Sequence, residues 1–180
     1  MSHPACDFEQ DSAAALAIGA KAVLVKADQR GYRLVSAESC TGGLVSSLLT
    51  DIEGYSSAFE RGFATYTDEA KIEVLGVDPG MIASHGVVSK EVAIAMAIGA
   101  LQRSHGDLAV SITGYAGPGD GVVEEGLVHL AVSTRHGATV HRECHFGKKG
   151  RDPIRHLAAK HAFEMLEEAL DRPVDADSAD

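Results

Sequence analysis

Apolar residues follow two alternating patterns along this chain, short continuous runs and longer segments with apolar positions three or four residues apart. The short runs are typical of strands, and the longer pattern is typical of helices. Capping residues mark several helix starts, namely Thr67, Asp78 followed by Pro79, and Ser89. In chain order the sequence predicts helix 12–28, strand 32–37, helix 44–49, strand 58–65, helix 68–75, a helical turn opening at 78–79, helix 90–103, strand 107–113, strands 127–134 and 139–146, and helix 151–170.

This order of elements predicts an α/β fold. Strands alternate with helices until a late hairpin around His136 and Gly137. Such an order is typical of a three-layer α/β/α sandwich around a mixed, mostly parallel sheet. No segment has the composition of a linker, so we expect one domain over residues 1–172, followed by a disordered acidic tail over 173–180.

Composition and charge narrow the possible partners. Hydrophobic residues make up 45% of the chain and charged residues 23%, which is ordinary for a globular protein. The 16 Lys and Arg residues against 26 Asp and Glu residues leave a net charge of -10. The resulting field repels polyanions, so we expect neither nucleic acid nor an anionic membrane as a partner. A small phosphorylated molecule needs only a local pocket of donors and stays possible.

Cysteine usage and the apolar runs indicate the compartment. Cys6, Cys40 and Cys144 are an odd number without CxxC spacing, which is not a disulfide framework. Acidic residues precede any apolar run at the N-terminus, unlike a secretory signal. The longest uncharged apolar run, 92–101, is too short to span a bilayer. We therefore expect a cytoplasmic protein.

Two strands run into glycine-rich turns, at 36–43 and 111–121. Ligands of open α/β sheets bind at the carboxyl ends of strands, where such turns meet helix N-termini. In the first turn Ser39 is a candidate nucleophile, with oxyanion donors among the amides of residues 40–43. Gly42 and Gly43 would let a substrate approach the backbone. Two alternatives remain: Ser39 or Thr41 is merely a helix N-cap, or Cys40 is the nucleophile, its thiol pKa lowered by the helix N-terminus.

The second turn is not a known nucleotide fingerprint. It lacks the lysine of GxxxxGK[ST] and does not fit GxGxxG. Its four glycines over 114–121 still indicate a shaped loop, whose amides could line a phosphate or ribose pocket. The alternative is a simple long turn.

A serine nucleophile needs a base. None of the nine histidines lies in an obvious catalytic context. With Thr67 as N-cap, Tyr66 and Lys71 occupy the two positions of a hydrophobic staple, so their side chains should converge. A lysine held near apolar surface loses its charge more easily, and a neutral lysine is a competent base. The alternative is a lysine whose ammonium reaches solvent over its apolar stem.

A different class of site is suggested by His141, Glu143 and His145. These residues alternate along the last predicted strand and share one face, as a two-His, one-carboxylate metal set would require. The alternative is a solvated strand face.

Four motifs in this order resemble the C-terminal domain of the CinA family: 37–43, 62–71, 85–89 and 113–118. The resemblance covers roughly residues 10–171. The stand-alone members of that family are nicotinamide-nucleotide amidohydrolases, so the resemblance implies hydrolysis of the carboxamide of nicotinamide mononucleotide to nicotinate mononucleotide and ammonia. It further implies a homo-oligomer that uses no metal and no cofactor. A non-catalytic binding domain of the same fold is the alternative.

Site residues also follow from the resemblance. Ser39 is expected to be the nucleophile, Lys71 the general base and Tyr66 the group that completes the proton relay. Two segments depart from the family pattern, 124–128 and 149–151, although Arg151 is retained, and Arg155 nearby could help to meet a phosphate. The residues expected to bind substrate are Glu38, Cys40, Thr41, Gly42, Gly43, Thr113, Gly114, Gly117 and Arg151.

Overall fold

The computed structural model describes residues 4–118, 123–137 and 139–172. Its helices are α1 (Pro4–Gln29), α2 (Leu44–Thr50), α3 (Asp68–Ala70), the π-helix η1 (Lys71–Leu75), α4 (Pro79–His85), α5 (Lys90–Gln102) and α6 (Arg151–Asp171). Its strands are β1 (Leu34–Glu38), β2 (Phe59–Ala64), β3 (Leu108–Gly114), β4 (Leu127–Thr134) and β5 (Thr139–His145). The predicted tail, 173–180, lies outside the described residues.

The strands form one mixed sheet in the order β2-β1-β3-β4-β5. β1 pairs in parallel with both β2 and β3, whereas β3 with β4 and β4 with β5 are antiparallel. Four strands therefore run in one direction and β4 runs in the other, as the mixed, mostly parallel prediction requires. In the register of the central pair, Glu38 lies opposite Ile112, so β1 and β3 end at the same edge of the sheet.

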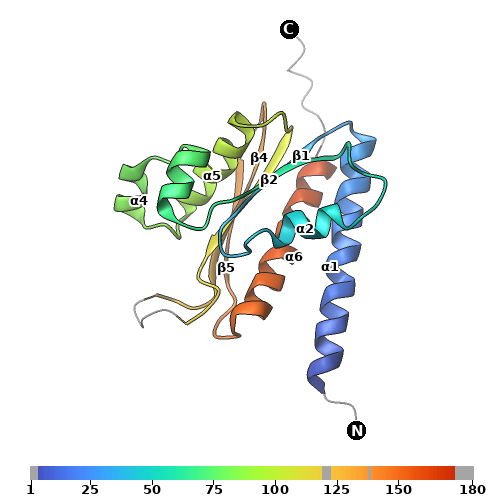
Figure 1. The fold of residues 1–180 in the computed structure, drawn as a ribbon, viewed down its shortest axis with the longest axis horizontal. Helices are drawn as coiled ribbons and strands as arrows, with labels where there is room; N and C mark the ends of the chain where they lie inside the picture. Colours follow the sequence, from blue (N-terminus) through green and yellow to red (C-terminus); the bar gives the residue numbers. More distant parts are fainter. Residues whose placement is uncertain (1–3, 119–122, 138, 173–180) are drawn as a thin grey trace.

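Helices cover both faces of the sheet, which confirms the three-layer α/β/α sandwich (Figure 1). α1, α2 and α6 pack on one face, and α4 and α5 lie on the other. Alternate residues of the central strands supply the two cores: Leu108 and Val110 face the α1–α6 layer, while Ala109 faces α5. Because both faces are covered, β1 is buried along its whole length.

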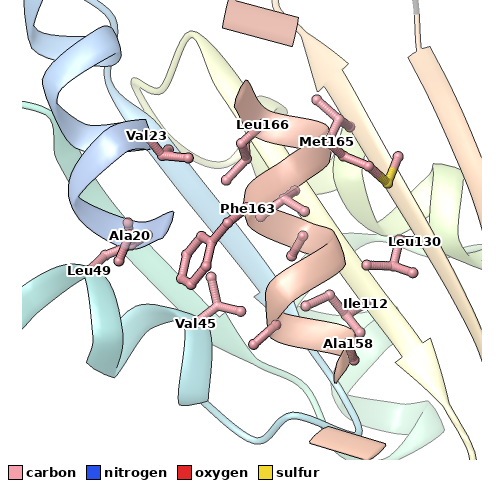
Figure 2. Packing of buried hydrophobic residues seen from close by; sticks show 14 of the residues in the cluster. Ala20, Val23, Val45, Leu49, Ile112, Leu130, Ala158, Phe163, Met165 and Leu166 are labelled. Carbon is pink, nitrogen blue, oxygen red and sulfur yellow. The ribbon is translucent and has the colours of Figure 1, made fainter. Parts of the chain in front are cut away.

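The larger core is organised around Phe163 of α6, which is buried between α1, α2 and the sheet (Figure 2). Ala20 and Val23 of α1 and Val45 of α2 approach it, and a Cβ added at Gly19 would lie 3.4 Å from its ring. Burial of an aromatic side chain of this kind contributes roughly 3–5 kcal/mol relative to alanine. This core fixes α2, and with it the turn that follows β1.

Most predicted boundaries are correct within a few residues, and the three predicted caps are present. Thr67 accepts from the Ala70 amide at 3.1 Å, Asp78 accepts from the Gly80 and Met81 amides, and Ser89 accepts from the Val92 amide at 3.3 Å. Two predictions were wrong in extent: the first helix begins at Pro4 rather than 12, and the turn at Asp78 continues as the helix α4.

The predicted helix 68–75 differs in type. It starts as α3 and widens into the π-helix η1 at Lys71, with its end marked by Gly76 at φ 70°. Across the part of the chain that the structure describes, no helix combines the length and apolar character needed to cross a membrane.

Candidate active site

A cavity of about 290 Å³ lies at the carboxyl ends of the three parallel strands β1, β2 and β3. The segments that follow these strands form its walls. Eight predicted site residues line it: Ser39, Cys40, Tyr66, Lys71, Thr113, Gly114, Gly117 and Arg151. The cavity is also lined by Asp68, Val87, Val88, Tyr115, Ala116 and Pro118, which the sequence did not single out as site residues.

Ser39 begins a tight turn at the end of β1. Its amide donates to Ile112 of β3 at 2.9 Å, and its carbonyl accepts from the Gly42 amide at 3.1 Å. Gly42 and Gly43 have φ values of 61° and 93°. Residues with a Cβ rarely adopt such backbone angles, so the turn itself requires both glycines. Gly43 is the N-cap of α2. The hypothesis that Ser39 or Thr41 is merely this N-cap was therefore wrong.

Glu38 lies beneath the turn rather than in the cavity. Its buried carboxylate accepts from the amides of Gly43, Val45 and Ser46 at 2.9–3.0 Å, and from the Ser46 hydroxyl at 2.8 Å. The Ser36 hydroxyl donates to it at 3.1 Å. This residue was predicted to bind substrate, but its oxygens are already occupied by the N-terminus of α2.

The occupied helix N-terminus changes the candidate oxyanion donors. The Gly43 amide donates to Glu38 and the Gly42 amide to Ser39, so neither is available to a ligand. Within the described segments, the amides of Cys40 and Thr41 donate to no other residue, although the Cys40 amide contacts its own thiol. The predicted set of donors over 40–43 therefore narrows to these two amides.

Thr41, Gly42 and Gly43 also build the turn instead of lining the cavity. The Thr41 side chain is fully buried, and its hydroxyl oxygen has no hydrogen-bond partner in the part of the chain that the structure describes. Gly42 and Gly43, predicted as substrate contacts, thus shape the turn that holds Ser39, and of Thr41 only the backbone amide remains a candidate contact.

Lys71 is completely buried and still lines the cavity. Its ammonium nitrogen donates to the carbonyl oxygens of Thr65 at 3.0 Å, Tyr66 at 3.4 Å and Thr67 at 3.5 Å. Removal from water lowers the pKa of this amine below its usual 10.5, and the carboxylate of Asp68 opposes that effect only in part. The alternative of a solvent-reaching lysine was wrong.

Lys71 is the first residue of the π-helix η1, and its own amide still donates to the Thr67 carbonyl as in an α-helix. Leu75 at the other end of η1 is buried against α5, where a Cβ on Gly99 would lie 2.1 Å from the Leu75 carbonyl oxygen. Glycine at this position of α5 is therefore needed for η1 to pack so closely. π-Turns of this kind occur frequently at functional sites.

Tyr66 approaches the cavity from its mouth. Its side chain is 64% exposed, and its hydroxyl oxygen accepts from Nη2 of Arg151 at 3.4 Å. The guanidinium carbon of Arg151 lies 6.0 Å from the centre of the Tyr66 ring. The predicted staple contact with Lys71 was wrong, because the lysine contacts the backbone carbonyl of Tyr66 while the ring faces Arg151.

The thiol pKa of Cys40 is raised, whereas a nucleophilic cysteine needs a lowered pKa. Its thiol is buried, and the loss of water raises its pKa to about 12, with the carboxylate of Glu38 adding to the shift. The α2 N-terminus does not lower this pKa as predicted, because the amides of that terminus point to Glu38. The raised pKa disfavours the thiolate near neutral pH, which argues against Cys40 as the nucleophile.

The loop after β3 forms the opposite wall. The Thr113 hydroxyl donates to the Val87 carbonyl at 2.9 Å, which joins the segment before α5 to the site. A Cβ on Gly114 would lie 2.8 Å from the Leu127 carbonyl oxygen, so glycine is needed where β3 and β4 part. Among the described residues, apart from its two chain neighbours, no atom lies within 4 Å of the Cβ position of Gly117. The hypothesis of a simple turn is replaced by that of a cavity wall, and residues 119–122 lie outside the described segments.

The start of α6 supplies two arginines with different surroundings. Arg151 lines the cavity, while Gly150 before it donates its amide to Glu125 at 3.1 Å. Arg155 donates through Nε and Nη2 to the Thr41 carbonyl, at 3.2 and 2.7 Å. The expectation that Arg155 helps to meet a phosphate was therefore wrong, since its guanidinium is directed to the backbone.

The predicted metal set on β5 does not assemble. His145 pairs with Glu143 at 2.8 Å and with Glu124 at 2.6 Å, whereas His141 contacts His129 at 3.0 Å. Across residues 4–118, 123–137 and 139–172, no three His, Cys, Asp or Glu side chains are grouped so that they could hold a metal ion. The strand face is instead a row of pairwise His–Glu and His–His contacts.

Comparison with known proteins agrees with this architecture. The sequence model of the CinA C-terminal domain family matches residues 17–170, which include all five strands and most of the helical residues. The chain belongs to the CinA C-terminal domain family. The resemblance carried by the four ordered motifs is thereby confirmed.

Several members of the CinA family are closely similar to this chain. Nicotinamide-nucleotide amidohydrolase PncC of Escherichia coli K12 is 46% identical over 140 residues, which cover 76% of this chain and 84% of PncC. A CinA-like protein of Acidobacterium capsulatum is 45% identical over 150 residues, covering 82% of this chain but 36% of that longer protein.

Solved CinA structures share the fold. The competence/damage inducible protein CihA of Agrobacterium tumefaciens superposes with a TM-score of 0.84 at 42% identity, covering 88% of this chain and 96% of CihA. A CinA superfamily protein of E. coli gives a TM-score of 0.74 at 33% identity, covering 81% and 88% of the two chains.

Proposed function

We propose that this protein is an amidohydrolase that converts nicotinamide mononucleotide to nicotinate mononucleotide and ammonia. Its 46% identical relative, the nicotinamide-nucleotide amidohydrolase PncC, supports the substrate. The observation that carries the chemistry is the completely buried Lys71, which shares a cavity with Ser39. A buried amine with a lowered pKa is the kind of base that a serine nucleophile needs.

In the proposed first step, neutral Lys71 accepts the hydroxyl proton of Ser39 while the serine oxygen forms a bond to the carboxamide carbon. The carbonyl oxygen of the substrate becomes an oxyanion that accepts from the amides of Cys40 and Thr41. Mutational studies of such donors give roughly 10²–10³-fold effects on rate, and positioned bases contribute roughly 10²–10⁴-fold. The segment that follows β1 supplies the two donor amides, and the segment that follows β2 supplies the base Lys71.

In the second step the carbon–nitrogen bond breaks. The leaving nitrogen takes a proton from the Lys71 ammonium and departs as ammonia, which leaves an ester on Ser39. Water then adds to this ester, again with Lys71 as base, and nicotinate mononucleotide leaves with the Ser39 hydroxyl restored. Tyr66 at the cavity mouth would complete the proton relay. The proposed cycle requires neither a metal nor a cofactor.

The cavity has features that suit a mononucleotide. Its volume of about 290 Å³ lies just below the range of roughly 300–1,000 Å³ for small-molecule sites, which suits one small ligand. The Arg151 guanidinium at its mouth is the cation that we propose to meet the phosphate. The open space at Gly117 would admit the ribose.

Product analysis tests this proposal. Purified protein is incubated separately with nicotinamide mononucleotide, nicotinamide riboside and nicotinamide, and ammonia and the carboxylate product are both quantified. We expect equal amounts of ammonia and nicotinate mononucleotide from the mononucleotide, and much slower release from the two compounds without phosphate. Absence of ammonia from all three compounds would contradict the proposal and favour a binding domain of the same fold.

A further inference from the structure

The side chain of Arg155 ends on the backbone of the turn that carries Ser39. Arg155 lies on α6, one helical turn after Arg151, and its Nε and Nη2 both donate to the carbonyl oxygen of Thr41. Nη1 lies 3.7 Å from the carboxylate of Asp152. The guanidinium thus joins α6 to a turn that is 114 residues earlier in the sequence.

The Thr41 carbonyl belongs to the peptide unit between Thr41 and Gly42, whose N–H donates to the Ser39 carbonyl at 3.1 Å. Because a peptide unit is planar, its carbonyl and its N–H rotate together. Gly42 has φ 61°, and glycine populates positive and negative φ almost equally. The Thr41 carbonyl accepts from the Leu44 amide at 3.3 Å as well as from Arg155, and rotation of the peptide unit would break these bonds together with the bond to Ser39. The shorter bond, 2.7 Å from the charged guanidinium, is the stronger of the two restraints on this carbonyl.

Different anchors hold the two halves of the turn. The later half is fixed by Glu38, which accepts from the amides of Gly43, Val45 and Ser46. The earlier half contains Ser39 and the amides of residues 40 and 41, and Glu38 does not contact it through these bonds. Arg155 supplies the side-chain contact there, through a charge-assisted, forked pair of hydrogen bonds that a lysine cannot reproduce.

The guanidinium also brings positive charge to the place where an oxyanion would form. Arg151 and Arg155 both act on the neighbouring Cys40 thiol, where they oppose the effect of burial on its pKa. The contact with Thr41 therefore combines a geometric constraint with a favourable field.

We propose that Arg155 is a positioning residue, which locks the Thr41–Gly42 peptide unit and so keeps Ser39 and the adjacent amides in their reactive arrangement. The proposal deepens the proposed function and rests on it for the nature of the reaction. It assigns to Arg155 no contact with substrate, so its loss should lower the rate of Ser39 chemistry more than it weakens substrate binding.

Arg155→Met and Arg155→Lys test the proposal, with Lys160→Met as the matched control. Lys160 lies on the same helix, is exposed, and its ion pair is with Glu164 at 3.9 Å. The first readout is the rate at which a fluorophosphonate labels Ser39, with Ser39→Ala as the blank. The second is kcat and KM for ammonia release from nicotinamide mononucleotide, measured across pH on protein shown to be folded by thermal unfolding.

We expect Arg155→Met to lower both the labelling rate and kcat at least tenfold, with KM changed less than threefold and the apparent pKa of the pH profile unchanged. Arg155→Lys should be intermediate, and Lys160→Met should match the wild type. Added guanidinium ion should partly restore labelling in folded Arg155→Ala.

Wild-type labelling and kcat in Arg155→Met would overturn the proposal, as would a loss confined to KM. If Arg155→Met does not fold, Arg155→Lys decides: wild-type labelling in it contradicts the need for a forked donor.

The labelling readout separates this proposal from the proposed function. Labelling of Ser39 that depends on Arg155, without ammonia release from nicotinamide mononucleotide, would refute the substrate and support the positioning role. Ammonia release that is insensitive to Arg155 would refute the positioning role and support the substrate. A wild-type protein in which Ser39 is not labelled at all would contradict the positioning role, because no reactive serine would then be held.

Discussion

The ammonium nitrogen of Lys71 lies 3.0 Å from the carbonyl oxygen of Thr65, on a side chain that solvent does not reach. The carbonyl oxygens of Tyr66 and Thr67 also accept from this nitrogen, and Lys71 lines the same cavity as Ser39. Burial favours the neutral amine and the carbonyls orient it. This combination supports the proposal that Lys71 is the base for Ser39.

The lowered pKa of Lys71 predicts how stability depends on pH. Between that lowered pKa and 10.5, the unfolded chain binds a proton at Lys71 that the folded chain does not, so the free energy of unfolding rises with pH. Below the lowered pKa the full cost of burying the ammonium is present. Relative to Lys71→Met, wild type should therefore gain stability as pH increases through this window. Denaturant unfolding of both proteins between pH 7 and 10 measures the difference, and parallel curves would contradict it.

The same group predicts the pH profile of activity. Since only the neutral amine accepts the Ser39 proton, kcat/KM should rise with pH through an apparent pKa below 10.5. The profile is measured with nicotinamide mononucleotide at constant ionic strength. A rate that falls over the same range, while the protein stays folded, would argue against Lys71 as the base.

Glu38→Gln should destabilise the protein and reduce activity together. The carboxylate accepts from the Gly43, Val45 and Ser46 amides, and an amide nitrogen would face those donors with a donor of its own. Loss of buried hydrogen bonds to a charged group costs roughly 1.5–3 kcal/mol in the free energy of unfolding. Glu53→Gln, an exposed carboxylate, is the matched control and should leave both quantities unchanged. An equal effect of the two substitutions would refute the role given to Glu38.

Cys40→Ala should retain activity within a few fold. The buried thiol, with its pKa raised to about 12, is not ionised near neutral pH. Iodoacetamide at pH 7.5 should accordingly leave the rate of ammonia release unchanged. Inactivation by the reagent in wild type, combined with loss of activity in Cys40→Ala, would return Cys40 to the position of nucleophile.

Features that depend on neighbouring residues could be predicted from the sequence. The caps at Thr67, Asp78 and Ser89 bond to amides two or three residues later, so local residue types determine them. The buried strand β3 is an apolar run interrupted only by small polar residues, and β1 is a similar run up to Glu38 at its end. The order of these strands with the helices was enough to predict the layer architecture.

Features of the site that depend on tertiary packing could not be predicted from the sequence. The Cys40 pKa was predicted in the wrong direction because Glu38 occupies the helix N-terminus and the surrounding core excludes water. The sequence held a local signal for the role of Glu38, because an acidic residue shortly before a helix can accept from the free amides at the helix N-terminus. Glu38 was instead predicted to bind substrate. The contact between Arg155 and Thr41 joins residues that only the packing of α6 on α2 and the sheet brings together, and no local pattern indicates it.

The π-helix at Lys71 is an intermediate case. Tyr66 and Lys71 were identified at the right helix start, but an ideal α-helix was assumed. The wider turn places the Lys71 ammonium on backbone carbonyls, including that of Tyr66, and leaves the Tyr66 ring exposed beside Arg151. The sequence therefore identified the two residues, but it did not predict that Lys71 contacts the Tyr66 carbonyl and not its ring.

The most direct test of the account is ammonia release from nicotinamide mononucleotide under enzyme excess, compared among wild type, Ser39→Ala and Lys71→Met. Loss of a nucleophile and loss of its base should each lower the single-turnover rate by about 10³-fold or more, since neither step can then proceed through the serine. Both variants should remain folded by circular dichroism and thermal unfolding. Release at more than a tenth of the wild-type rate by either folded variant would contradict the assignment of Ser39 and Lys71 as the reacting pair.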